Sequence, residues 1–228
     1  MSYQLFLGYI VEGTTDKNFL HSIIERTISE MLFKYSNKDI EIITFALTKD
    51  GNTFIEQSIS AIRKGHFENS ANIIFIHADA DHSTSEKVIK YKINPLNKLL
   101  SEDEELKTCN IVPIIPVHMI EAWMLADFNL FKSEVSTDKT KSQLNLSGNP
   151  EQFSDPKRKI IEALKIVKDE LPKKRRKELK INDLYQIMGQ KIEIYHLNTL
   201  QSFLEFYKNL FEVLKKMNLI NHNIKLEL

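Results

Sequence analysis

Apolar positions in the first 131 residues follow two patterns in turn, short continuous runs and stripes with a helical period. Runs rich in β-branched and aromatic residues indicate buried strands, whereas apolar residues three or four positions apart indicate the inner face of a helix. On this basis strands are predicted at residues 4–11, 40–47, 72–77 and 110–117, and helices at 14–32, 53–64, 83–100 and 119–126. Strands and helices that alternate along a chain form a parallel sheet covered on both faces, so we predict an α/β protein.

The character of the chain changes after residue 131. Between residues 132 and 156 apolar residues are sparse and Ser, Thr, Asn and Pro accumulate, which predicts a loop or linker. Residues 157–228 have mainly helical spacing and end in a long amphipathic helix near 199–217, suited to internal packing or to formation of a homodimer. We therefore predict an α/β domain over residues 1–131 and a helical C-terminal region over 157–228 that packs on or beside it.

Acidic residues stand where two of the predicted strands end. Glu12 follows the first strand, and Asp79 and Asp81 follow the third. Ligands of parallel sheets bind outside the carboxyl ends of the strands, so we expect these three side chains to lie together. Gly13 would allow a close approach of the backbone. The alternative interpretation makes the aspartates turn residues and Glu12 an acid that favours a helix start.

Three carboxylates at one edge of a sheet repel one another unless a cation lies between them. A ligand set made only of oxygen atoms selects a hard ion, so the pattern predicts a site for Mg²⁺ or Mn²⁺. A metal held in this way can polarise a phosphoryl oxygen and activate a water. His77 and His118 lie close to these acids in sequence and are interpreted either as structural histidines or as phosphate contacts.

Four segments of the chain resemble motifs of one superfamily, in the same order. VEGTTDKNFL (residues 11–20) is similar to the glutamate motif of Toprim domains, and HADAD (77–81) to their Asp-x-Asp motif. VHMIEAWMLAD (117–127) and LYQIMGQKIEIYHLNTLQSFLEFY (184–207) resemble a bacterial family of Toprim-like proteins related to the overcoming-lysogenization-defect nucleases. The resemblance covers most of the chain, and residues 132–180 are the part without a match.

This resemblance implies a Toprim-like, Rossmannoid parallel sheet of about four strands that carries a nuclease site. By position, Glu12, Asp79 and Asp81 would hold the first metal, with Glu12 also acting as a general acid or base. Asp16 and Glu121 occupy the places of acids that help to hold a second metal in the nuclease branch. Asp16 is equally well explained as a first-turn helix acid, whereas Glu121 stands among apolar residues and is costly to bury without a partner.

Basic residues are concentrated in one stretch, although the chain as a whole has a formal net charge of zero. Residues 157–180 contain eleven Lys and Arg against four Asp and Glu, so basic charge is concentrated there. The densest run is Lys173, Lys174, Arg175, Arg176 and Lys177. Such a strip can bind the phosphate backbone of nucleic acid without sequence preference, or it can be a solvated helix face.

The function predicted from these patterns is a Mg²⁺-dependent nuclease that hydrolyses DNA or RNA, with phage defence as the role that the resemblance implies. Two alternatives stay open. One is a Toprim subunit of an ATPase complex, either non-catalytic or activated by its ATPase partner protein, since the chain has no phosphate-binding glycine loop. The other is a phosphatase of the haloacid-dehalogenase type. The single Cys109 and the lack of an evident export or membrane-spanning segment lead us to expect a cytoplasmic location.

Overall fold

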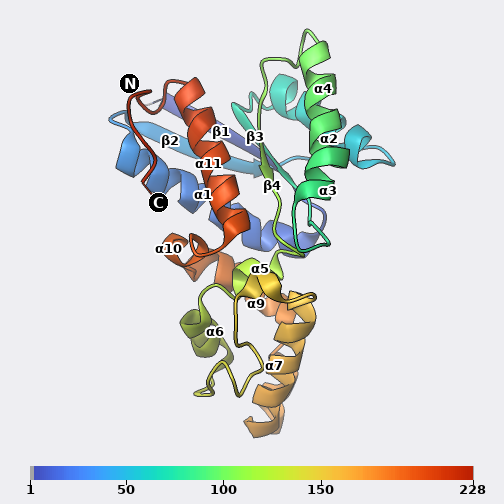
Figure 1. The fold of residues 1–228 in the computed structure, drawn as a ribbon, viewed down its shortest axis with the longest axis vertical. Helices are drawn as coiled ribbons and strands as arrows, with labels where there is room; N and C mark the ends of the chain where they lie inside the picture. The colour runs from blue at the N-terminus through green and yellow to red at the C-terminus, as the bar shows by residue number, and fades with distance from the viewer. Residues whose placement is uncertain (1–2, 228) are drawn as a thin grey trace.

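Four parallel strands form the central sheet (Figure 1). The computed structural model describes residues 3–227, apart from the side chains of Lys173, Arg175 and Glu178. The strands are β1 (Tyr3–Ile10), β2 (Ile40–Ala46), β3 (Ile73–His77) and β4 (Asn110–Ile114), in the order β2-β1-β3-β4. The predicted α/β class with a parallel sheet of four strands is confirmed, because each predicted apolar run is a strand paired in parallel with its neighbours.

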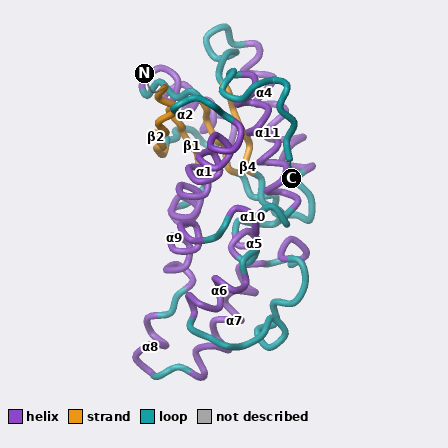
Figure 2. Tube along the Cα trace, turned by 90° about the vertical axis from the view of Figure 1, so that its left-hand side faces the viewer, coloured by secondary structure: helices purple, strands orange, loops and turns teal. Residues whose placement is uncertain are grey.

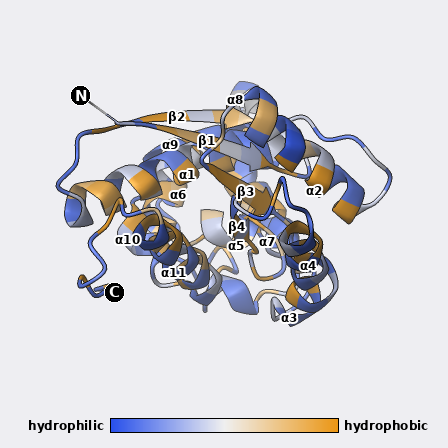
Figure 3. Ribbon diagram, turned by 90° about the horizontal axis from the view of Figure 1, so that it is seen from above, coloured by the Kyte–Doolittle hydropathy of each residue, from blue (hydrophilic) through white to orange (hydrophobic). Residues whose placement is uncertain are grey.

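Helices cover both faces of this sheet. On one face lie α1 (Thr14–Tyr35) and α11 (Gln201–Lys216), and on the other lie α2 (Phe54–Arg63) and α4 (Asn94–Glu102). The two faces follow from the alternation of side chains along a strand: Phe75 packs toward α1 and α11, and Ile76 toward α2 and α4. Figure 3 shows the expected pattern, with apolar colour along β3 and helices that carry both polar and apolar colour.

The predicted helix at 83–100 is interrupted before its proline. It consists of α3 (Glu86–Val88), a π-helical turn η2 (Ile89–Ile93) and then α4, in which Pro95 occupies the first turn. A proline is tolerated there because its missing N–H would have no partner in a first turn. A second π-helical turn, η1 (Lys64–Glu68), extends α2.

The rest of the chain is helical and extends away from the sheet, so that the molecule is elongated (Figures 1 and 2). Its elements are α5 (Glu121–Met124), α6 (Phe128–Val135), the 3₁₀ turn η3 (Pro150–Gln152), α7 (Pro156–Glu170), α8 (Lys173–Glu178), α9 (Ile181–Lys191) and α10 (Ile194–Leu197). Helix α6 crosses the boundary predicted at residue 131, so the loop begins later than its predicted start at 132.

One apolar core joins the helical region to the sheet. It includes residues of α1, β4, α7, α9 and α11, so the two parts predicted from sequence share a core. Helix α9 lies directly against α1, where Gly189 brings the two backbones together. In the described part of the chain, no helix combines the length and the apolar composition that crossing a membrane requires.

The start of α11 is held by a residue about fifty positions away. The buried carboxylate of Glu151, in η3, accepts hydrogen bonds from the backbone N–H groups of Gln201 and Ser202 and from the Ser202 hydroxyl. The indole N–H of Trp123 in turn donates to the Ser202 oxygen at 2.8 Å. These contacts satisfy the free N–H groups of a helix start that lacks a side-chain cap of its own.

Candidate functional site

The carboxyl ends of β1 and β3 lie side by side and bring a histidine between two acids. The imidazole of His77, the last residue of β3, lies with Nε2 3.2 Å from Oδ1 of Asp79 and Nδ1 3.9 Å from Oδ2 of Asp16. Asp16 is in the first turn of α1, and its Oδ2 also accepts a hydrogen bond from the Gly13 N–H at 2.9 Å. We call Asp16, His77 and Asp79 the acid–histidine cluster.

The acid–histidine cluster is buried but incompletely hydrogen-bonded. The His77 side chain is 1% exposed, against 14% for Asp16 and 21% for Asp79. Neither nitrogen of His77 nor Oδ1 of Asp79 has a partner with hydrogen-bond geometry among the described residues, although His77 and Asp79 approach to ion-pair distance. Buried polar atoms in folded proteins are nearly always hydrogen-bonded to protein groups, ordered water or a bound ion, so these atoms are candidates for contact with water or a ligand.

Glu12 faces a different side of the same edge. Its carboxylate is half exposed, and Oε1 lies 4.0 Å from the ammonium group of Lys92. Lys49 donates hydrogen bonds to the carbonyl oxygens of Val11 and Glu12, at 3.0 and 3.4 Å. These residues line a cleft of ≈ 290 Å³ that also reaches His77. His77 therefore connects this lysine-rich cleft with the acid–histidine cluster.

Asp81 does not join the other acids. It lies on an exposed turn with φ of 51°, a left-handed conformation that aspartate tolerates better than most residues. Its backbone N–H donates to the His118 carbonyl at 2.9 Å, and within the described part of the chain its carboxylate makes no hydrogen bond or ion pair. His77 thus lies between Asp79 and Asp16, and in the described structure no hydrogen bond or ion pair joins Glu12 or Asp81 to these three residues; the shared site of Glu12, Asp79 and Asp81 stays a prediction.

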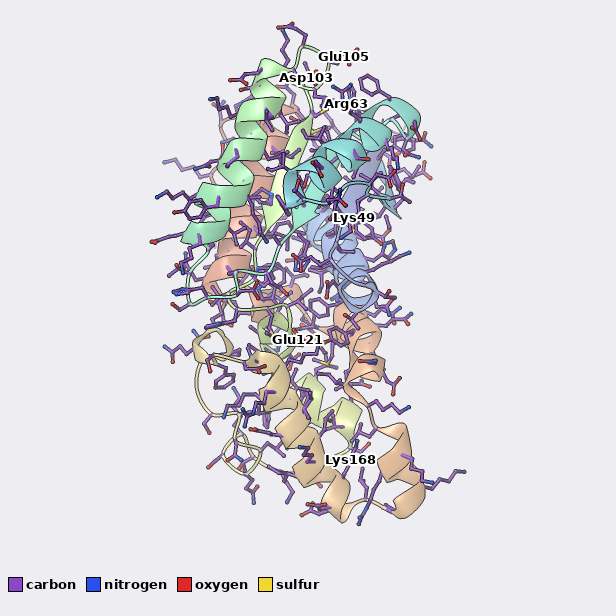
Figure 4. All side chains as sticks on the ribbon, turned by 90° about the vertical axis from the view of Figure 1, so that its right-hand side faces the viewer. Lys49, Arg63, Asp103, Glu105, Glu121 and Lys168 are labelled. Carbon is purple, nitrogen blue, oxygen red and sulfur yellow. The ribbon has the colours of Figure 1, made fainter. Side chains whose placement is uncertain are left out.

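Glu121 is buried, as its apolar neighbours predicted, and it has two partners. The Tyr185 hydroxyl donates a hydrogen bond to Oε1, and the Lys157 ammonium lies 3.3 Å from the same atom. Figure 4 shows Glu121 at the junction between the sheet and the helical region, with Lys49 on the sheet side. Because Tyr185 belongs to α9 and Lys157 to α7, the helical region supplies both groups that compensate the buried carboxylate.

Tyr185 lies close enough to the acids for their charges to act on it. Burial, the hydrogen bond to Glu121 and the negative charges of Glu121, Asp16 and Asp79 raise the pKa of Tyr185 far above its ordinary range. Burial also raises the pKa of Tyr207, on α11, to about 12. Both hydroxyls therefore stay protonated in the native protein at pH values where an unfolded tyrosine ionises.

This difference predicts a loss of stability at high pH. Above pH of about 10 the unfolded tyrosines release protons that native Tyr185 and Tyr207 retain, so the free energy of unfolding should fall by about 1.4 kcal/mol per pH unit for each group. Urea unfolding between pH 8 and 11 measures this slope. Tyr185→Phe and Tyr207→Phe should each make this slope shallower, and Tyr195→Phe is the control at an exposed tyrosine. If both Tyr185→Phe and Tyr207→Phe kept the wild-type slope, the raised pKa values of these two tyrosines would not be its cause.

The basic run lies at the end of the molecule away from the sheet (Figure 2). Lys174 and Lys177 are exposed, whereas the Arg176 guanidinium donates to the carbonyl oxygens of Leu171 and Asp169, near the C-terminus of α7. Arg176 thus has a structural role at the end of α7 that its sequence position did not reveal. The side chains of Lys173 and Arg175, also predicted to bind nucleic acid, lie outside the described residues.

Four functional candidates were missed by the sequence analysis: Lys49, Lys92, Lys157 and Tyr185. Each is of a common residue type and is distant in sequence from the acid that it contacts. Lys49 carried a signal, because it follows a predicted strand and so lies at the carboxyl edge of the sheet, and Lys157 begins the basic stretch at 157–180. Lys92, Lys157 and Tyr185 are brought to the site by helices whose packing no local pattern specified.

The fold and the site together define an α/β protein with a parallel sheet and a partly buried group of acids at the carboxyl ends of its strands. The chain belongs to the DUF4276 family, described as a domain of unknown function, whose family model matches residues 11–210. The matched region contains all the acids discussed above and most of the helical region. No curated protein and no solved structure matches the chain.

Proposed function

We propose that this protein is a metal-dependent phosphodiesterase that cuts nucleic acid at the acid–histidine cluster. The observation that carries the proposal is the buried Oδ1 of Asp79 at the carboxyl edge of the sheet, which lacks a partner with hydrogen-bond geometry and lies beside His77, whose other nitrogen faces the second acid, Asp16. A cation at this position would satisfy the oxygen and offset the repulsion between the two carboxylates. The resemblance of the glutamate and Asp-x-Asp segments to Toprim motifs supports the same chemistry.

The donor atoms present fit a hard divalent ion. The described residues contain no group of three or more His, Cys, Asp or Glu side chains already placed to hold a metal. Mg²⁺ does not require such a cage, since it commonly binds through one or two carboxylates and keeps waters for exchange with substrate phosphate. Asp79 and Asp16 would hold it, with Glu12 as a further ligand or base. Glu121, already paired with Lys157 and Tyr185, positions the helical region against the site.

The cleft beside Glu12 suits a phosphate group. Lys49 and Lys92 place two cations at the carboxyl end of β1, in the cleft that Glu12 also lines. Cationic side chains bind the phosphate groups of nucleic acid whatever its base sequence. Binding of a phosphate to Lys92 would release this lysine from Glu12. Glu12 would then be free to accept a proton from the attacking water. His77 would keep Asp16 and Asp79 oriented from between them, and Mg²⁺ when bound would polarise the phosphoryl oxygen.

Cleavage of nucleic acid is expected with Mg²⁺ or Mn²⁺ and not with EDTA. Purified protein would be incubated with plasmid DNA, single-stranded DNA and structured RNA, and products resolved by electrophoresis. Asp79→Asn and Glu12→Gln should each lower the rate by about 10²-fold or more, because each removes a ligand or a proton acceptor. Asp138→Asn is the matched control, since Asp138 is exposed and makes no side-chain hydrogen bond in the described structure.

Three outcomes separate the alternatives. Cleavage that survives both site substitutions would contradict the proposed site. Mn²⁺ binding without cleavage, lost in Asp79→Asn, would favour a subunit that an ATPase partner activates. Transfer of phosphate to Asp79 from a phosphomonoester would favour the haloacid-dehalogenase type of chemistry.

A further inference from the structure

A second cavity lies on the α1 side of the sheet, and its lining includes Lys17, the residue that follows Asp16. It has a volume of ≈ 350 Å³ and is formed by the first half of α1, the end of β2 and the middle of α9. The side chains that give it chemical character are Tyr9, Asn18, His21, Thr44, Gln186 and Gln190. Cavities of this size accept small organic ligands.

The cavity is rich in polar groups without partners. The Nδ1 atom of His21 and the Oγ1 atom of Thr44 are buried and have no hydrogen-bond partner within the described structure. The side-chain amides of Asn18, Gln186 and Gln190 likewise make no hydrogen bond there; they are exposed at the rim. A ligand with several donors and acceptors would therefore find partners in the amides that α1 and α9 contribute.

The lining also limits the class of ligand. It contains no Asp or Glu, so a metal ion has no carboxylate to bind, and Lys17 is its only cation, so an anion alone is weakly held. An apolar ligand would leave the amides unpaired. Two aromatic rings, Tyr9 and His21, lie 5.7 Å apart along one side. Neutral amides together with aromatic rings suit a flat heterocycle that hydrogen-bonds along its edge.

The helices α1 and α9 contribute residues both to this cavity and to the acidic site. Lys17 follows Asp16 on α1, and Gln186 follows Tyr185 on α9, so each helix contributes adjacent residues to the site and to the cavity. The two helices are fixed against each other at Gly189. A nucleotide with its phosphate near Lys17 and Asp16 could thus reach the cavity with its base.

We infer that the cavity binds one unpaired nucleobase, held by the amides of Asn18, Gln186 and Gln190. The inference rests on the proposed function for its substrate, and it makes that substrate single-stranded or locally unpaired. Enzymes that act on nucleic acid commonly read an exposed base by hydrogen bonds to its edge and by contact with aromatic rings. The three amides, together with Thr44, would set which base is preferred.

Binding of single nucleotides tests the inference without any need for cleavage. The full chain would be titrated calorimetrically with AMP, GMP, CMP and UMP, and with ribose 5-phosphate as the ligand that lacks a base. At least one nucleotide should bind about tenfold more tightly than ribose 5-phosphate. The double variant Gln186→Ala/Gln190→Ala should lose that tenfold difference, whereas Gln152→Ala, an exposed glutamine elsewhere, should retain it. Circular dichroism establishes that the variants are folded.

The outcomes distinguish this inference from the proposed function. Equal affinity for all nucleotides and ribose 5-phosphate would overturn the base pocket, even if the protein cleaves nucleic acid. Base-dependent binding that the double variant abolishes would support the pocket, even if no cleavage occurs and the proposed function fails. If both hold, the double variant should cleave single-stranded homopolymers with a changed base preference, while Asp79→Asn should slow the cleavage of all of them.

Discussion

Gly189→Ala is expected to destabilise the protein by about 3 kcal/mol, which for a chain of this size lowers the melting temperature by roughly 6–12 °C. A β-carbon at Gly189 would lie 2.5 Å from the carbonyl oxygen and 2.9 Å from the Cα of Phe19. These are backbone atoms of α1, so the clash is relieved only by moving α1 away from α9. Alanine gains about 1 kcal/mol of helix propensity over glycine, which the clash outweighs.

Gly65→Ala provides the matched control for this substitution. Its added β-carbon would meet the ends of the Ile74 and Leu47 side chains at 3.0 Å, and flexible side-chain ends yield more easily than backbone. Urea unfolding followed by circular dichroism should therefore show a clearly larger loss for Gly189→Ala than for Gly65→Ala. Equal losses would mean that α1 and α9 do not pack as closely as described.

Glu151→Ala is expected to lower the free energy of unfolding by about 3 kcal/mol. The substitution leaves three donors without their acceptor, namely the backbone N–H groups of Gln201 and Ser202 and the Ser202 hydroxyl. Helix α11, which covers one face of the sheet, would then begin without a cap. The only tryptophan of the chain, Trp123, donates to the same Ser202, so its fluorescence reports the change directly.

The control for Glu151→Ala is a glutamate with an exposed ion pair. Glu162 accepts a hydrogen bond from Arg158 one turn earlier in α7, and such surface pairs contribute at most about 0.5 kcal/mol. Glu162→Ala should leave both the unfolding midpoint and the fluorescence of Trp123 nearly unchanged. If Glu151→Ala were equally mild, the carboxylate would not be the cap of α11.

The strands and the parallel sheet could be predicted because their signal is local. The run at 73–76 is apolar at every position, as a strand buried on both faces requires, and it is followed by His77 and Asp79, which the site uses. The same reasoning placed Glu12 and Asp79 at the same edge of the sheet, and the burial of Glu121 was expected from its apolar neighbours. The side chains that contact Glu121 were harder to predict, since Tyr185 and Lys157 lie 64 and 36 positions from it in the sequence.

The position of the Asp81 carboxylate could not be predicted from the local sequence pattern. A motif of two aspartates with one residue between them predicts two carboxylates at one site, but the left-handed backbone at Asp81 turns the chain, and its carboxylate is left without a partner in the described structure. Asp16 takes the neighbouring position instead, because the start of α1 brings its first turn to the end of β3. That geometry depends on how a helix crosses a sheet, which residue spacing does not encode.

The sequence by itself determined the class of the fold, the order of its strands and helices, and the edge of the sheet where acids collect. These features follow from apolar periodicity and from the position of polar residues at strand ends, both of which are read within a few residues. The tertiary structure alone decided that His77 lies between Asp16 and Asp79, that Glu121 is compensated from α7 and α9, and that a polar cavity forms between α1, β2 and α9. Each of these features depends on packing between segments far apart in the chain. The close contact of Gly189 with the backbone of α1 is one such packing contact, and it sets how near α9 lies to α1.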